Sequence, residues 1–243
     1  MRPLLLGHRG ARASRHIAEN TPASFELCLQ HGCDGFEFDV RRSADDEAVI
    51  CHDQRHKGLK IAKTPAKILA LPKLEEVLQD FSSRAFLDIE LKVTGLERQT
   101  IAALKHPPQK GYVVSSFLPD VLSRFHDLDA SVPLGLLSEH RDQLPMESRA
   151  PRPAKLRASG PFDLAQGKLA RTPVAPPELS VTWVIPRVDL VDQALVKEFH
   201  AVGKKIMVWT VNRAETIRQL SGWGVDAIIS DETELVAQVV LGL

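Results

Sequence analysis

The sequence predicts an α/β protein, a (β/α)8 barrel with a small hairpin insertion after the second strand. Three observations favour this fold. Short apolar runs alternate with amphipathic segments along most of the chain, which is typical of parallel strands joined by helices. The polar link at residues 42–47 is too short for a parallel crossover. No G-x-G-x-x-G motif opens a helix after a strand, which disfavours a doubly wound dinucleotide-binding sheet.

Length and composition narrow the class of protein further. The 243 residues suit one large domain, so we expect a single domain over residues 1–243. The 31 Lys and Arg residues balance 31 Asp and Glu residues, and only 5% of the chain is aromatic, which disfavours a nucleic-acid partner. A hydrophobic content of 44% excludes disorder of the whole chain.

Two further features predict a cytoplasmic protein without stable membrane association. No apolar run approaches the roughly 18 residues of a membrane span, and no signal-peptide core follows Arg2. Cys28, Cys33 and Cys51 are odd in number and form no C-x-x-C pair, so we expect reduced, buried thiols. The oligomeric state has no signature in the sequence.

The apolar runs define the candidate strands in chain order. They are Leu4–His8, Gly35–Arg41, Ala48–His52, Ala85–Leu91, Gly111–Phe117, Val132–Leu137, Val181–Pro186, Lys205–Val211 and Asp226–Ser230. The short polar link predicts that Ala48–His52 pairs antiparallel with the strand before it, at the mouth of the barrel. The other eight strands then form the barrel.

Amphipathic segments between these strands predict the helices. They are Thr21–His31, Leu74–Phe81, Leu96–Lys105, Pro119–Leu128, Val191–Val202, Ala214–Trp223 and Glu232–Leu241. Asp231 is well placed to cap the last helix at its N-terminus.

Two stretches interrupt the alternation. Residues 42–84 form the predicted small insertion after the second strand. Residues 145–178 form an irregular stretch that is rich in proline and, from Arg149 to Arg171, carries six Lys and Arg residues against one acid. A barrel loop this long is usually either functional or disordered, so it is interpreted as a disordered insertion or as a basic flap over an anionic substrate.

Acidic side chains alternate with apolar ones in two of the predicted barrel strands. Glu37 and Asp39 share one face of the second strand, and Asp88, Glu90 and Lys92 share one face of the strand that follows the insertion. Because the apolar faces pack outward against the helices, these charged side chains point into the barrel.

A divalent cation best explains so many acids in one interior. Burying unpaired carboxylates costs several kcal/mol each, and a cation with oxygen ligands offsets this cost. We expect Glu37, Asp39 and Glu90 to bind Mg²⁺ or Ca²⁺, with Mn²⁺ also suited to oxygen ligands, whereas Asp88 lies one layer deeper. The alternative is an internal salt-bridge network with Lys92 and water.

Other polar residues occur at the carboxyl ends of strands, where the active sites of such barrels lie. His8 ends the first strand and His52 ends the hairpin strand, which makes them candidate acid and base groups. Arg9 is followed by Gly10, which permits a tight turn, and its guanidinium could form two hydrogen bonds to an anionic group. Trp209 is interpreted either as core packing or as a platform for a substrate's carbon atoms.

Several motifs occur in an order that spans most of the chain. They are Gly7-His8-Arg9-Gly10, Glu19-Asn20-Thr21, Glu37-Phe38-Asp39-Val40, His52-Asp53, Glu90-Leu91-Lys92 and Trp209-Thr210-Val211-Asn212. Together they resemble the glycerophosphodiester phosphodiesterase family. The resemblance runs from residue 4 to residue 231 and is interrupted near residues 140–178.

This resemblance implies a TIM barrel that hydrolyses glycerophosphodiesters to glycerol 3-phosphate and an alcohol. It implies that the residues matching Glu37, Asp39 and Glu90 bind a divalent metal and that His8 and His52 are the acid/base pair. The residues matching Arg9, Glu19 and Lys92 would line the phosphate and metal site, and Trp209 the substrate pocket.

The sequence leaves the assignment of base and acid open, with His8 as base and His52 as acid preferred.

A lysophospholipase D-like phosphodiesterase is the nearest alternative function, and a charged segment after His52 favours water-soluble diesters over it. A non-catalytic barrel that binds a phosphodiester is a second alternative, which the intact set of candidate residues disfavours. A lyase or aldolase would need a lysine or an acid placed for carbon chemistry. Lys92 is the only inward candidate, and the flanking histidines fit phosphoryl transfer better.

Overall fold

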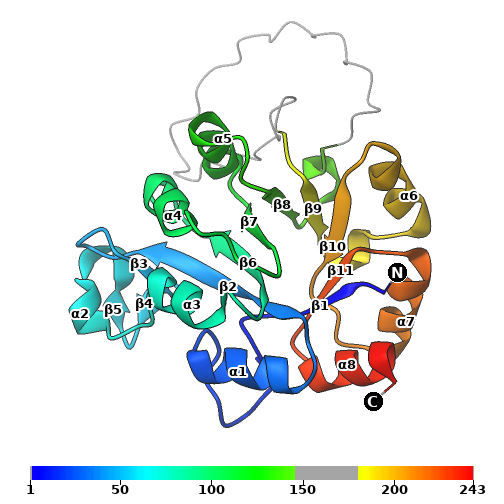
Figure 1. Ribbon diagram of the computed structural model, residues 1–243, viewed down its shortest axis with the longest axis horizontal. Helices are drawn as coiled ribbons and strands as arrows, with labels where there is room; N and C mark the ends of the chain where they lie inside the picture. Colours follow the sequence, from blue (N-terminus) through cyan, green and yellow to red (C-terminus); the bar gives the residue numbers. More distant parts are fainter. Residues whose placement is uncertain (1, 146–179, 243) are drawn as a thin grey trace, which may run out of the picture.

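The computed structural model describes residues 2–145 and 180–242, and within them eight parallel strands close into the predicted (β/α)8 barrel (Figure 1). The strands follow one another around the barrel in chain order. They are β1 (Leu4–Gly7), β2 (Gly35–Arg42), β6 (Phe86–Leu91), β7 (Tyr112–Ser116), β8 (Leu134–Ser138), β9 (Trp183–Pro186), β10 (Lys205–Val208) and β11 (Ala227–Ser230). β1 pairs with both β2 and β11, and this pairing closes the sheet.

The predicted helices surround the barrel. They are α1 (Pro22–Gln30), α3 (Leu74–Phe81), α4 (Glu97–Ala103), α5 (Pro119–Leu128), α6 (Gln193–Ala201), α7 (Ala214–Trp223) and α8 (Thr233–Leu241). In the described ranges, no helix combines the length and apolar character that crossing a bilayer requires. The stretch 145–178 lies outside the described residues except for Pro145.

The predicted N-cap of the last helix is wrong. Glu232 occupies the N-cap of α8 without a side-chain hydrogen bond, whereas the carboxylate of Asp231 turns toward His8. Sequence position alone could not separate these roles, because an aspartate just before a helix suits either one.

The insertion after β2 begins with the predicted hairpin. β3 (Ala48–Ile50) pairs antiparallel with the end of β2, with Val40 opposite Ile50. It is followed by β4 (Arg55–His56), β5 (Leu59–Lys60), the 3₁₀ turn η1 (Ile61–Lys63) and α2 (Ala66–Leu69), which gather at one side of the barrel (Figure 1). Sequence patterning missed these four elements because each has at most four residues and shows no apolar period.

Two apolar layers hold the barrel together. The outer layer lies between strands and helices and includes stacked aromatic rings. The ring centroids of Phe25 in α1 and Phe36 in β2 lie 4.2 Å apart. The inner layer fills the barrel. Gly35 allows β2 to approach β6, because a Cβ at this position would lie 1.8 Å from the carbonyl oxygen of Phe86. This close pairing sets the positions of the acidic side chains that follow.

Candidate active site

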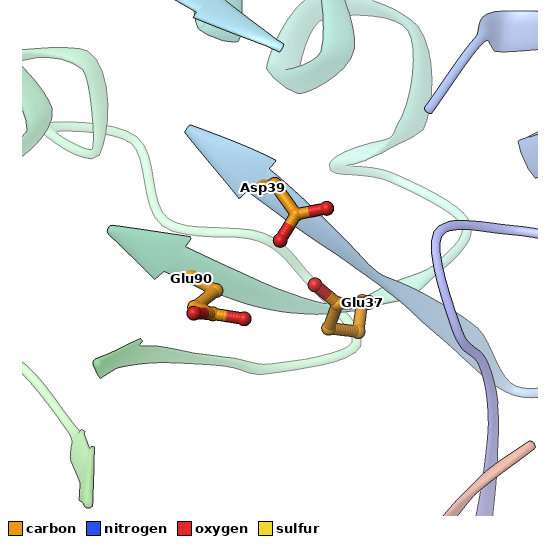
Figure 2. A group of neighbouring side chains, drawn as sticks. All are labelled: Glu37, Asp39 and Glu90. Atoms are coloured by element: carbon orange, nitrogen blue, oxygen red, sulfur yellow. The ribbon is translucent and has the colours of Figure 1, made fainter. Parts of the chain in front are cut away.

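Three acidic side chains converge at the carboxyl ends of β2 and β6. The strand register places Asp39 directly beside Glu90 and Glu37 beside Asp88. Glu37, Asp39 and Glu90 each offer a carboxylate oxygen within 4.8 Å of the others, and Figure 2 shows the three groups turned toward one another. All three are buried, with exposed fractions of 3%, 0% and 5%. The structure thus brings together the three residues proposed as metal ligands.

The acidic cluster carries more negative charge than its surroundings neutralise. Burial raises the pKa of Glu37 well above its ordinary value, and the charges of Asp39 and Glu90 raise it further. Burial likewise raises the pKa of Glu90 to about 8. Burial also acts on Asp39, but Lys92 and Arg9 outweigh it and lower the pKa of that carboxyl. Glu37 Oε1 is buried and accepts no hydrogen bond from any described residue.

Asp88 belongs to a deeper layer, as its place in the strand predicts. Its Oδ1 accepts a hydrogen bond of 2.6 Å from Ser115 Oγ on β7, and burial raises its pKa to about 7. It is not part of the group whose oxygens lie within reach of one ion.

Two cations line the cluster. Lys92 Nζ lies 2.8 Å from Asp39 Oδ1 and also pairs with Glu90. Arg9 Nε lies 3.2 Å from Asp39 Oδ2, and the backbone N–H of Arg9 donates to Glu37 Oε2 at 2.9 Å. Arg9 and Gly10 have φ values of 55° and 80°, so a left-handed turn directs this N–H at the carboxylate.

Two further residues act behind this group. Glu19 accepts a hydrogen bond of 2.8 Å from Arg9 Nη1 and so orients the guanidinium, but it is not among the residues that line the cavity. Asn20 Nδ2 donates to Asp39 Oδ2 at 2.7 Å. Sequence reasoning gave Asn20 no role of its own, although it stands within the Glu19-Asn20-Thr21 motif.

His8 follows β1 and is held by a carboxylate. Its Nδ1 lies 2.7 Å from Asp231 Oδ1, while Asn212 and Arg12 donate to Asp231 at 2.7 and 3.1 Å. Burial acts against ionisation, yet the hydrogen bond from His8 and these other donors hold the pKa of Asp231 far below its ordinary value. An ionised carboxylate only accepts hydrogen bonds, so Nδ1 of His8 carries a proton. Its Nε2 lies 4.0 Å from Glu37 Oε2.

His52 follows β3 and has a similar partner in more open surroundings. Its Nδ1 lies 2.8 Å from Asp53 Oδ1, and the hydrogen bond from His52 lowers the pKa of that carboxyl. The exposed fractions of the two side chains are 36% and 78%. Arg41 Nε donates to the backbone carbonyl of His52 at 2.7 Å and ties it to the end of β2.

A cavity of about 110 Å³ joins these groups. His8, His52, Arg9, Lys92, Glu37 and Glu90 line one part of it. Its other wall is largely apolar and includes Phe117 and Trp209, whose rings meet edge to face at 5.3 Å. Trp209 Nε1 donates to the Ile185 carbonyl, which fixes the indole at the wall. Such a cavity suits acid/base chemistry on an anionic ester with a small carbon skeleton.

Sequence reasoning missed Asp231, Asn20 and Phe117 as parts of this site. Asp231 was interpreted only as the cap of the last helix, and Phe117 only as the last residue of a candidate strand. Their contribution depends on which strands meet across the barrel: Asp231 follows β11, which is the neighbour of β1.

Comparisons with known proteins agree with this geometry. The model of the glycerophosphoryl diester phosphodiesterase family matches residues 8–97 and 82–235. A glycerophosphodiester phosphodiesterase of Caldanaerobacter subterraneus subsp. tengcongensis is 26% identical, over 99% of this chain and 98% of its own length. Another, of Bacillus subtilis, is 25% identical over 99% of this chain and 87% of its own.

Solved structures share the fold. A glycerophosphodiester phosphodiesterase from Parabacteroides distasonis superposes with a TM-score of 0.77 at 21% identity, covering 99% of this chain and 98% of that one. An Oleispira antarctica phosphodiesterase, solved with its product sn-glycerol 3-phosphate, gives a TM-score of 0.73 at 23% identity, covering 98% and 97%.

Proposed function

This chain belongs to the glycerophosphoryl diester phosphodiesterase family, and on that premise we propose that it hydrolyses glycerophosphodiesters to glycerol 3-phosphate and an alcohol, with a divalent cation and two histidines. The main observation behind the proposal is that two histidines and an acidic cluster meet at one cavity. Each of the two histidines contacts an aspartate through Nδ1. Relatives that carry this activity in their names match nearly the whole chain.

The buried acids fit a divalent cation. Glu37, Asp39 and Glu90 would hold it, since their oxygens are close together and Glu37 Oε1 has no hydrogen-bond donor among the described residues. Carboxylate oxygens are hard ligands that suit Mg²⁺, Ca²⁺ or Mn²⁺. A bound cation of this kind would neutralise phosphoryl charge and help to activate a nucleophile.

Arg9 and Lys92 would bind the phosphodiester. A phosphodiester is anionic and resists nucleophiles, so its charge must be offset before the phosphorus can be attacked. Both cations line the cavity and are held in place by carboxylates, which spares the cost of ordering them when substrate binds. Trp209 and Phe117 would pack against the glycerol carbons at the apolar wall.

The two histidines would move the protons. His8 Nε2 takes a proton from the nucleophile, which is either water or the glycerol hydroxyl beside the ester. The oxygen of the nucleophile forms a bond to phosphorus as the bond from phosphorus to the alcohol oxygen breaks, and His52 Nε2 gives a proton to the departing alkoxide. If the glycerol hydroxyl attacks, the first product is a cyclic glycerophosphate, which a water molecule then opens to glycerol 3-phosphate by the reverse proton transfers. The proximity of His8 to Glu37, and the position of His52 on the insertion, support this order over its reverse.

Release of glycerol 3-phosphate from a panel of glycerophosphodiesters, with and without EDTA, tests the function. We expect turnover that EDTA abolishes and that His8→Ala or His52→Ala lowers by about 10²–10⁴-fold each. His200→Ala is the matched control, because His200 also pairs with an aspartate but is not among the residues lining the cavity. It should leave turnover unchanged.

A substrate with a p-nitrophenolate leaving group separates the roles. This leaving group departs without a proton, so His52→Ala should recover most of its activity on it, whereas His8→Ala should not. Recovery in His8→Ala instead would reverse the assignment. A lysophospholipid in the same panel tests the lysophospholipase D-like alternative, and binding without turnover of any diester would indicate the non-catalytic one.

A further inference from the structure

A second cleft, of about 220 Å³, lies outside the catalytic cavity and carries only positive charge. It is formed by the end of β2, the β4–β5 hairpin, η1 and the residue after Lys92, and five cationic side chains and one amide stand among its lining: Arg41, Arg42, Arg55, Lys60, Lys63 and Gln54. Among residues 2–145 and 180–242, no acidic side chain lines it. Five cations around so small a volume repel one another, and a bound anion would offset this repulsion.

Most of these cations form no ion pair with a carboxylate of the described residues. In the part of the chain that the structure describes, Arg42 pairs with Asp46 at 3.5 Å, and both are exposed. Arg55 donates to the Gly58 carbonyl, and Arg41 donates only to the His52 carbonyl. No ion pair within those residues involves Lys60 or Lys63. Arg41 is half-buried, so its charge has lost part of its hydration. The carboxylates of Asp39, Glu90 and Asp53 attract it from a distance, but none of them forms an ion pair with it.

The cleft adjoins the catalytic cavity on the side of His52. Arg41 belongs to the cleft and holds the backbone of His52, which lines the cavity. Val93 of the cleft follows Lys92 of the cavity in the chain. If His52 protonates the departing alcohol, that alcohol leaves on the same side as the cleft.

We propose that this basic cleft binds a negatively charged group on the alcohol portion of the substrate, so that the enzyme prefers glycerophosphodiesters whose alcohol carries a phosphate. The proposal rests on the proposed function and adds a substrate class to it. The flexible lysines would provide charge and Gln54 a hydrogen bond, while Arg41 and Arg55 provide planar donors for phosphate oxygens.

Two substrates that differ by one phosphate test the preference. We expect kcat/KM for glycerophosphoinositol 4-phosphate to exceed that for glycerophosphoinositol by about 10-fold or more. Lys60→Gln combined with Lys63→Gln should remove most of this preference and leave glycerophosphoinositol turnover unchanged. The control pair is Lys105→Gln with Lys110→Gln, which changes the net charge equally in the α4–β7 link. The proposal would be overturned if the wild-type enzyme had equal kcat/KM for the two substrates. It would also be overturned if both double variants lost the preference to the same extent.

Direct binding separates this inference from the activity itself. Calorimetry with inositol 4-phosphate, the alcohol that would be released, should detect binding that weakens about 10-fold in the Lys60/Lys63 variant, even if no diester is hydrolysed. A membrane surface is the competing ligand, because Leu59 and Ile68 are exposed nearby. Cosedimentation with phosphatidylserine vesicles that is lost in this variant, while inositol 4-phosphate binds neither protein, would assign the cations to a membrane and overturn the proposal.

Discussion

His8 and His52 each pair Nδ1 with an aspartate, but the two pairs are supported by different parts of the molecule. Asp231 follows a barrel strand, is 16% exposed as a side chain, and accepts from Arg12 and Asn212 as well as from His8. Asp53 is adjacent to its histidine in the chain, is 78% exposed, and has only His52 as a side-chain partner among the described residues.

This difference separates a rigid half of the site from an open half. The barrel half contains the acidic cluster, Arg9, Lys92 and His8, whose positions are set by strand register and by hydrogen bonds or ion pairs with one another and with neighbouring residues. The hairpin half contains His52, which a backbone contact from Arg41 ties to the barrel. We therefore expect turnover to be more sensitive to substitution of Asp231, which holds His8, than of Asp53, which holds His52. The open half is better suited to vary with the departing alcohol.

The largest effect is expected at Glu37. Glu37→Gln keeps an acceptor for the Arg9 N–H but removes a charge from the cluster, so turnover should fall by at least about 10³-fold. The same change should raise Tm by about 3 °C in EDTA at pH 8, because burial and the neighbouring carboxylates oppose ionisation of Glu37. Differential scanning fluorimetry with EDTA, Mg²⁺ or Ca²⁺ measures this.

The pH dependence has a definite sign. The pKa of Glu37 is raised well above 4.5 and that of Glu90 is raised from 4.5 to about 8, in both cases first by burial. Above pH 4.5, the two carboxyls keep their protons in the folded protein but lose them in the unfolded chain. The free energy of unfolding of the metal-free protein therefore falls as pH rises from about 4.5 toward 8. The increase in Tm caused by metal should therefore be larger at pH 8 than at pH 6, and absent in Glu37→Gln.

Glu75→Gln on the exposed face of α3 is the matched control for Glu37→Gln. It removes the same charge without touching the site, so its turnover and metal response should equal those of the wild type. An unchanged response to metal in Glu37→Gln would contradict the proposed ligand set.

The next effect is expected at Asp231. Asp231→Asn removes the negative charge beside His8 Nδ1, and its amide can donate to Nδ1 and fix the tautomer that carries the proton on Nε2. We expect kcat to fall by about 10²-fold or more, with KM little changed. The loss should persist on the p-nitrophenyl substrate, because His8 is proposed to act on the nucleophile rather than on the leaving group.

Asp226→Asn supplies the control for this measurement. Asp226 precedes β11 and pairs with His200 at 2.8 Å, so the change removes a histidine–aspartate pair that does not line the cavity. It should affect Tm but not kcat. A kcat in Asp231→Asn that matches that of Asp226→Asn would end the distinction between the two halves of the site.

The inward position of the acidic cluster could be predicted from sequence patterning. Alternation along β2 and β6 placed Glu37, Asp39 and Glu90 on inward faces, because side chains of a strand point alternately to its two sides. The eight-strand count followed from the short polar link before Ala48, which the structure confirms as a hairpin. Both predictions depend on local spacing, which a single sequence contains.

Contacts across the barrel could not be predicted in this way. Asp231 and His8 are 223 positions apart and meet because β11 closes the barrel onto β1. Asp231 also satisfied the local rule for an N-cap, so the wrong interpretation was the simpler one. The basic cleft depends likewise on β4, β5 and η1, whose short polar segments have no apolar period to predict them.

The smallest effect is expected at Asp53, and it tests the comparison most directly. Asp53→Asn removes an exposed charge whose attraction to His52 is largely screened by water, so kcat should fall by only about 3-fold. Because His52 is proposed to protonate the leaving group, even this loss should vanish on the p-nitrophenyl substrate, unlike that of Asp231→Asn. A loss at Asp53 as large as that at Asp231 would mean that the hairpin half closes and becomes desolvated when substrate binds. Repeating the assay at high salt decides this, since a screened surface pair would lose its remaining effect and a desolvated pair would keep it.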